Sequence, residues 1–352
     1  MKTFFNDKNL NKSNRYYYNL SDSNRTFFYA IACSLLTSLV FSFAIIIFSG
    51  ISGFELETLT KGNQIVGYLQ VIIMPVVYFM LFYFYNKRNN VNPVASLGIK
   101  NPIDWKCMLI TIAMAIVCIA SFVPFINLVS KPFEIWGYEG QSYPFEMYNW
   151  WTLILGIVGY AIFPAFAEEL VFRGMIQKGY EKKFTPFVAV FVSTLAFCLM
   201  HGSLQQTFYQ LILGVILGVI YVLGKNIIYP MIFHILNNTF VLLIDYFQWP
   251  KYMDAEFFNY NTFWGITLPI IIAIVGAGII VGLVFLMKKV TKKSNNKAEF
   301  IIEGENIIFE EDNKKYGIKS LFKAQNQHEL MYFLMGFGVA IILWINNTIE
   351  GF

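Results

Sequence analysis

Charged residues are scarce in this sequence of 352 residues. Asp, Glu, Lys and Arg make up 14% of it, against ~25% in soluble globular domains. Apolar residues account for 57% even before the 24 glycines are counted, whereas soluble domains have ~45–50% with glycine included. A soluble protein of this size cannot bury that much apolar surface. Disordered, collagen-like and nucleic-acid-binding proteins are excluded as well, which leaves an all-α protein that crosses a membrane several times.

Cysteine is also rare, and its placement excludes two kinds of site. Each of the four cysteines lies in an apolar stretch, and none is part of a CxxC pair, which argues against a disulfide framework or a thiolate zinc site. No Ser or Cys lies in a recognisable nucleophile motif, so chemistry through an acyl-enzyme is not suggested. The four residues are Cys33, Cys107, Cys118 and Cys198.

The beginning of the sequence does not look like a cleavable signal peptide. Residues 1–26 are polar and contain five Lys and Arg residues. The apolar run that follows, about 27–50, is too long for the hydrophobic region of a signal. We therefore expect a polar N-terminal tail, 1–26, followed by a first membrane-spanning helix.

Long apolar runs are what the sequence has in abundance. A run of ~17–25 apolar residues is long enough to span a bilayer as a helix. Nine such runs predict a membrane helix bundle with an eight-helix domain at 27–287, a charged linker at 288–329 and an additional C-terminal helix within 330–352. The runs are about 27–50, 65–85, 107–129, 150–177, 186–203, 205–223, 226–247, 263–287 and 330–348. Within the linker, Phe300–Phe309 has an apolar–polar pattern compatible with a small hairpin.

The basic residues support this layout. Of the 26 Lys and Arg residues, 23 fall in alternate segments outside the predicted helices, and the other three are Lys61, Lys131 and Lys251. Because cytoplasmic loops of membrane proteins are enriched in Lys and Arg, we expect a cytoplasmic N-terminus, a cytoplasmic linker and a C-terminus outside. The abundance of Ile, Lys and Asn resembles the composition of proteins from AT-rich bacteria, so the expected location is a bacterial plasma membrane.

Ionisable residues inside membrane helices are functional candidates, because each costs roughly 2.5–3.5 kcal/mol to insert. The fourth run contains the sequence AFAEELVFRGM. Glu169 and Arg173 are four residues apart, on one helix face where they can form an ion pair. Glu168 projects about 100° away and need not take part in that pair. An acid held by an arginine beside a second acid suits general-base catalysis, although a structural salt bridge is the alternative.

Two of the three histidines also lie in apolar runs. The fifth run ends with Phe197 and His201, and the seventh contains His234 and Asn238, each pair four residues apart. With a rise of ~1.5 Å per residue, Glu168 and both histidines fall at similar depths in a ~30 Å hydrocarbon layer. We therefore expect one cluster of catalytic groups. His328, in the charged linker, is interpreted as a surface residue.

This set of side chains is compatible with two chemistries. A Glu with a His can deprotonate a water molecule, while a second His and an Asn can donate hydrogen bonds to an oxyanion. Alternatively, Glu168, His201 and His234 could bind Zn²⁺ or another divalent metal. The HExxH motif of many zinc peptidases is absent and Asn is a poor zinc ligand, so no metal cofactor is favoured.

The motifs EExxxR, FxxxH and HxxxN follow one another along the sequence. In this order they resemble the motifs of the CPBP family, which includes the type II CAAX prenyl endopeptidases and the bacterial Abi proteins linked to bacteriocin processing and immunity. The resemblance covers about 150–245, within a predicted catalytic core at 150–247, and residues 288–352 look like an addition to it. The motifs are EExxxR (Glu168, Glu169, Arg173), FxxxH (Phe197, His201) and HxxxN (His234, Asn238).

The resemblance implies an intramembrane endopeptidase and a role for each motif residue. Glu168 would be the base that activates water with help from His201, and His234 and Asn238 would stabilise the oxyanion. Glu169, Arg173 and Phe197 would support the site. The family has been described both as metalloproteases and as metal-free glutamate proteases, so the metal question stays open.

The expected substrate is a membrane-embedded or lipidated peptide or protein in the lipid bilayer, and nucleic acid is not an expected partner. Prenylation is not assumed, because bacteria generally lack prenylated CAAX proteins; a leader peptide, a peptide pheromone or a small membrane protein fits equally well. Two other functions remain open. One is a non-catalytic immunity or scaffold protein of the same fold, and the other is a transporter that uses the buried acids and histidines as an ion relay.

Overall fold

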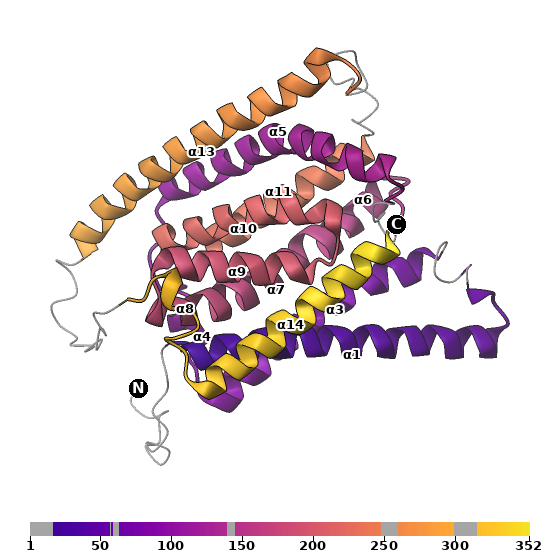
Figure 1. The fold of residues 1–352 in the computed structure, drawn as a ribbon, viewed down its shortest axis with the longest axis horizontal. Coiled ribbons are helices and arrows are strands. Elements are labelled where there is room, and N and C mark those ends of the chain that lie inside the picture. The colour runs from indigo at the N-terminus through magenta and orange to yellow at the C-terminus, as the bar shows by residue number, and fades with distance from the viewer. Residues whose placement is uncertain (1–16, 57, 59–62, 139–144, 248–259, 299–314) are drawn as a thin grey trace, which may run out of the picture.

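The computed structural model describes the chain except residues 1–16, 57, 59–62, 139–144, 248–259 and 299–314. The described residues form a bundle of helices that run back and forth between two ends (Figure 1). The prediction of an all-α bundle is confirmed. In chain order the longer helices are α1 (Leu20–Ser52), α3 (Gln64–Asn89), α5 (Trp105–Ile135), α9 (Pro186–Met200), α10 (Leu204–Gly224), α11 (Ile228–Tyr246), α13 (Phe263–Ala298) and α14 (Gln327–Glu350). The segment between α5 and α9 and the short helices α4 (Pro93–Ser96) and η4 (Ile318–Ser320) complete the described helices.

Each of the nine predicted spans is helical, but they are not equally long. Among the described residues, eight helices are long and apolar enough to cross a membrane. The exception is the predicted span 186–203, which forms α9 with only 15 residues. At ~1.5 Å per residue, α9 is about 22 Å long, short of a ~30 Å hydrocarbon core.

The N-terminal end of α1, the end of α13 and the start of α14 lie at the same end of the bundle (Figure 1). Which end faces the cytoplasm stays a prediction.

The first helix begins earlier than predicted. α1 starts at Leu20, within the residues 1–26 that were expected to form a polar tail. Asn19 and Asp22 form a capping box that satisfies the first backbone N–H groups. Asp22 also accepts a hydrogen bond from the Tyr85 hydroxyl at 2.8 Å. The polar residues at the start of α1 are predicted as tail by their low hydropathy. Hydropathy does not reveal that contacts with other helices satisfy their hydrogen-bonding groups.

The predicted linker is also shorter than expected. α13 continues to Ala298, eleven positions past the predicted end, because the Lys- and Asn-rich sequence extends the helix without being apolar. The predicted hairpin Phe300–Phe309 lies outside the described residues. The described part that follows leads into α14, whose start is fixed by a capping box between Asn326 and Glu329.

The fourth span is one run of 34 helical residues, Trp150–Lys183, with two π-helical stretches. The stretches η1 (Ile157–Ile162) and η2 (Leu170–Gln177) flank α7 (Phe163–Glu169), and α6 (Trp150–Gly156) and α8 (Lys178–Lys183) lie at the two ends. π-helical turns are rare and are frequent at functional sites. Here they enclose the segment that carries both acids of the EExxxR motif.

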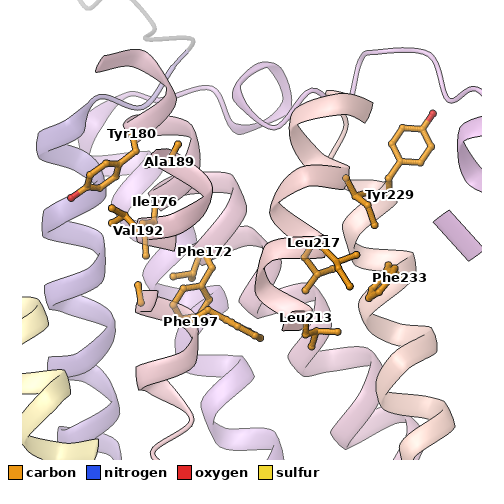
Figure 2. Packing of buried hydrophobic residues seen from close by; sticks show 14 of the residues in the cluster. Phe172, Ile176, Tyr180, Ala189, Val192, Phe197, Leu213, Leu217, Tyr229 and Phe233 are labelled. Atoms are coloured by element: carbon orange, nitrogen blue, oxygen red, sulfur yellow. The ribbon is translucent and has the colours of Figure 1, made fainter. Parts of the chain in front are cut away.

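Carbonyl groups in and near these stretches accept hydrogen bonds from side chains of other helices. Ser193 of α9 donates to the Phe172 carbonyl at 2.8 Å, and Ser23 of α1 donates to the Ile176 carbonyl at 2.9 Å. Figure 2 shows Phe172 and Phe197 side by side in the core between these helices, with ring centroids 5.3 Å apart. The η2 stretch thus joins the acid-bearing span to α9 and to α1.

Two glycines let α10 approach this span closely. Gly214 and Gly218 form a GxxxG pattern, which favours close helix packing in membranes. Their carbonyls accept hydrogen bonds from Arg173 Nη2 at 3.4 Å and from Gln177 Nε2 at 3.0 Å. A Cβ atom at Gly218 would lie 2.8 Å from Cγ1 of Val190. Val190 belongs to α9, and the same Cβ atom would lie 3.0 Å from Oε1 of Gln177 in the fourth span, so glycine is needed for α10 to approach both helices.

We expect Gly218→Ala to destabilise the folded protein by about 1–3 kcal/mol, because the added methyl group overpacks the contact with Val190. The midpoint of thermal unfolding in detergent measures this effect. Gly278→Ala in α13 is the matched control, since a Cβ atom there meets nothing within 4 Å, and alanine favours helix more than glycine does. Equal midpoints for the two variants would contradict the packing argument.

The four cysteines are free, as predicted. Cys107, Cys118 and Cys198 are buried and Cys33 is partly buried. They pack in the helices and form no disulfide.

Candidate active site

Glu169 is the most enclosed acid of the predicted site. Its side chain has no exposed surface, and its Oε1 lies 2.9 Å from Arg173 Nη1. Arg173 is equally buried, and its guanidinium lies 4.4 Å from the centroid of the Phe197 ring. The ion pair expected from the i,i+4 spacing is therefore present. A buried pair of this kind needs further polar partners to offset its desolvation, and Arg173 has one in the Gly214 carbonyl.

His234 joins the two acids. Its Nδ1 lies 2.9 Å from Oε1 of Glu169, and its Nε2 lies 3.8 Å from Oε2 of Glu168. Because an ionised carboxylate only accepts hydrogen bonds, the contact with Glu169 places a proton on Nδ1. Nε2 is then the nitrogen that faces Glu168.

The two adjacent glutamates differ in their surroundings. Glu169 accepts hydrogen bonds from Arg173 and from His234 and is fully buried. The Glu168 side chain is 20% exposed, and its contact with His234 is too long for a direct hydrogen bond. Glu168 is thus the acid that remains available to a bound molecule.

His201 lies at the C-terminal end of α9, where the helix ladder stops. Its Nδ1 lies 2.9 Å from the Phe197 carbonyl. The backbone N–H of His201 does not bond to this carbonyl, because it donates to the carbonyls of Cys198 and Leu199 instead. The Phe197 ring packs against both imidazoles, with its centroid 4.6 Å from that of His201 and 5.8 Å from that of His234. His201 also interacts electrostatically with Glu168 and His234, so α9 brings both of its motif residues to the cluster.

Asn238 is held by a chain of hydrogen bonds that the sequence did not indicate. Its Nδ2 donates to the Tyr160 carbonyl at 3.5 Å, and its Oδ1 accepts from Asn237 Nδ2 at 3.3 Å. Oδ1 of Asn237 accepts in turn from the Tyr209 hydroxyl. Pro164 explains the first contact, because proline has no N–H to donate to the carbonyl four residues before it. A proline inside the fourth run was the available signal.

Asn237, Tyr209 and Tyr160 are functional candidates that sequence analysis missed. Asn237 is buried, and its position beside Asn238 on an apolar helix could have drawn attention to it. Tyr160 is close enough to Glu168 for an electrostatic interaction. Tyr209 comes from α10, and only the packing of α10 against α11 brings it to the site.

Metal binding by Glu168, His201 and His234 stays a prediction. Among the described residues, no group of three His, Cys, Asp or Glu side chains lies in an arrangement that could hold a metal ion. Nδ1 of His234 faces Glu169, and Nδ1 of His201 faces a carbonyl. These contacts occupy Nδ1 of each histidine and leave Nε2, and metal-binding histidines are commonly held through their other ring nitrogen in the same way.

His328 lies far along the chain from this cluster, at the start of α14. It is exposed, and its Nε2 lies 3.3 Å from Arg25 Nη2. This agrees with its interpretation as a surface residue.

Fold and site together define an integral membrane helix bundle with a buried acid–arginine–histidine cluster. Residues 149–240 match the family model described as type II CAAX prenyl endopeptidase Rce1-like. All three motifs fall inside the matched segment, so the family resemblance is confirmed there, and the matched family is a family of peptidases. No match was found among curated proteins or among solved structures.

Proposed function

We propose that this protein is an intramembrane endopeptidase that hydrolyses a peptide bond with a water molecule activated by Glu168. One observation carries the proposal most directly: the two adjacent acids are in different settings. Arg173 and His234 both bond to Glu169, while Glu168 faces the site 3.8 Å from Nε2 of His234. A base for water needs such an accessible carboxylate, held in place by its surroundings.

The proposed reaction assigns a proton to each step. Glu168 takes a proton from water, and the water oxygen bonds to the carbonyl carbon of the substrate. Asn238 donates from its Nδ2 to the resulting oxyanion, and His234 in its protonated form donates from Nε2. The C–N bond then breaks, and Glu168 returns the proton to the leaving nitrogen, so base and acid are the same group.

The other motif residues have supporting roles in this proposal. With Nδ1 turned to the Phe197 carbonyl, His201 has Nε2 available to orient the attacking water. Glu169 fixes the ring of His234, and Arg173 balances the charge of Glu169. Phe197 packs against both imidazoles and limits their movement.

The substrate class follows from the surroundings of the site. A cluster inside a helix bundle is reached by a chain that is itself in the membrane or attached to it by a lipid. We propose a membrane-embedded or lipidated precursor of a peptide or small protein as substrate, with the bacterial plasma membrane as the location and the basic end of the bundle on the cytoplasmic side.

The proposed chemistry requires no metal ion. We therefore expect the rate of peptide cleavage to persist after dialysis of the purified protein against a chelator. Loss of cleavage that returns on addition of Zn²⁺ would contradict this expectation and would favour metal activation of the water.

The proposal is tested by comparing peptides from membranes and medium of cells that carry the wild-type protein or Glu168→Gln at matched expression. We expect peptides with new termini in the wild type that are lost in the variant, and their flanking residues would identify the substrate and any prenyl-cysteine motif. Identical peptide sets would contradict the proposal and would favour a non-catalytic immunity or scaffold protein.

A further inference from the structure

The C-terminal addition contacts both ends of the short helix that carries His201. α9 is flanked by residues 178–185 on one side and by the turn to α10 on the other. The segment from Lys315 to Phe352 reaches both of these places, although it lies outside the segment that matches the peptidase family. α14 packs along α1 and also against α9.

At the first end, the addition pairs with the residues just before α9. Tyr316 and Phe184 form a parallel bridge. Thr185 N–H donates to the Tyr316 carbonyl at 3.0 Å, and Tyr316 N–H donates to the Lys183 carbonyl at 3.1 Å. Lys183 also forms an ion pair with Glu329, with Nζ and Oε2 3.2 Å apart. These bonds fix the point at which α9 begins.

At the second end, α14 contacts the turn that follows His201. The indole N–H of Trp344 donates to Oγ1 of Thr207 at 2.8 Å. The backbone at Gly202 has a φ of +57°, and a Cβ atom there would lie 2.4 Å from Nδ2 of Asn347. The Asn347 amide therefore rests directly on the residue next to His201.

Thr207 is joined to the residues around His201 by short contacts. Its Oγ1 donates to the Ser203 carbonyl at 2.7 Å, and its own carbonyl accepts from Sγ of Cys198 at 3.3 Å. The Cys198 carbonyl accepts the backbone N–H of His201 at 3.2 Å. Trp344 thus connects to His201 through the turn itself.

From this geometry we infer that α14 is a positioning element for the active site, and that Trp344 and Thr207 are positioning residues that fix the His201 imidazole relative to Glu168. α9 is too short to be held by the bilayer at both ends, so the addition holds it instead. Displacements of ~1 Å in a catalytic group can cost a large part of the rate. The inference rests on the proposed function for its effect on rate, but its effect on His201 can be measured without a substrate.

The test uses ¹⁵N-histidine-labelled full-length protein in detergent, because the chain has only three histidines. His201→Gln and His328→Gln assign the ring resonances. We expect Trp344→Phe, which keeps the ring and removes the indole donor, to shift the His201 resonance more than that of His234. Trp264→Phe is the matched control, since Trp264 lies on α13 with its side chain 62% exposed. An unchanged His201 resonance in Trp344→Phe, or an equal shift in the control, would overturn the inference.

Thr207→Val removes the acceptor of the Trp344 hydrogen bond and also the hydrogen bond from Thr207 to the Ser203 carbonyl. We expect it to shift the His201 resonance at least as far as Trp344→Phe does, and we expect the double variant to add nothing beyond Thr207→Val, because Trp344 acts through Thr207. Additive shifts would overturn the pairing.

The effect on rate separates this inference from the proposed function. Cleavage of the peptide that the cell comparison identifies should slow between about twofold and tenfold in Trp344→Phe, as for the loss of one hydrogen bond, with KM unchanged. If the wild type cleaves nothing, the proposed function fails, and the histidine spectra still decide whether α14 positions His201. A raised KM with unchanged kcat would overturn the positioning role.

Discussion

Replacing Glu168 with Gln is expected to lower the rate of peptide cleavage by about 10²–10⁴-fold, the range of a lost general base, while the protein folds as before. Glutamine keeps the shape of the side chain and removes its ability to take a proton from water. The Glu168 side chain is partly exposed and takes no part in the ion pair between Glu169 and Arg173. Because the change leaves both hydrogen bonds to Glu169 in place, we expect the thermal midpoint in detergent to stay within a few degrees of the wild type.

The control for this variant is Glu134→Gln in α5. Glu134 forms an exposed ion pair with Lys131, a contact of little energetic weight, and we expect neither rate nor midpoint to change. Full cleavage by Glu168→Gln would contradict the assignment of Glu168 as the base. A loss of rate together with unfolding would show a structural role instead.

Arg173→Ala is expected to have the largest effect on stability, about 3–5 kcal/mol, because it leaves the fully buried Glu169 without its main partner. The change also removes the contact with the Phe197 ring and the hydrogen bond to the Gly214 carbonyl. Cleavage should be lost as well, since Glu169 fixes the ring of His234. Unfolding by denaturant in detergent, followed beside the cleavage rate, measures both effects.

Two further variants test this interpretation: one changes the charge of the pair, and the other is a control at an exposed arginine. Glu169→Gln keeps an oxygen for both donors but leaves the charge of Arg173 unbalanced, so we expect a smaller loss of stability than for Arg173→Ala and a comparable loss of rate. Arg88→Ala changes an exposed arginine at the end of α3 and should lie within ~0.5 kcal/mol of the wild type. An unchanged unfolding midpoint in Arg173→Ala would contradict the role assigned to the pair.

The fold could be predicted in outline because hydropathy and the alternation of basic segments respond to the membrane itself. They do not respond to tertiary contacts, and the errors lie where such contacts decide. The start of α1 at Leu20 depends on partners from α3, and the shortness of α9 depends on a chain reversal at Gly202. The apolar residues that lead up to His201 give no sign that α9 ends early.

The site could be predicted in part because spacing within one helix fixes which side chains share a face. The pair Glu169–Arg173 and the contact of Phe197 with His201 are of this kind. The bond between His234 and Glu169 joins two helices, and the hydrogen bonds from Tyr209 to Asn238 join α10 and α11. Neither relation is encoded in local spacing, and the bond between His234 and Glu169 decides which of the two acids is available.

The central claim is that a water molecule activated by Glu168 hydrolyses a peptide bond in a membrane-associated substrate. The most direct test incubates purified wild type and Glu168→Gln in liposomes with the peptide identified from cells, in water enriched in ¹⁸O, and analyses the products by mass spectrometry. The account predicts cleavage by the wild type with one ¹⁸O in the new C-terminal carboxyl group, and no product from Glu168→Gln. An intact peptide with the wild type, or equal cleavage by both proteins, would contradict it.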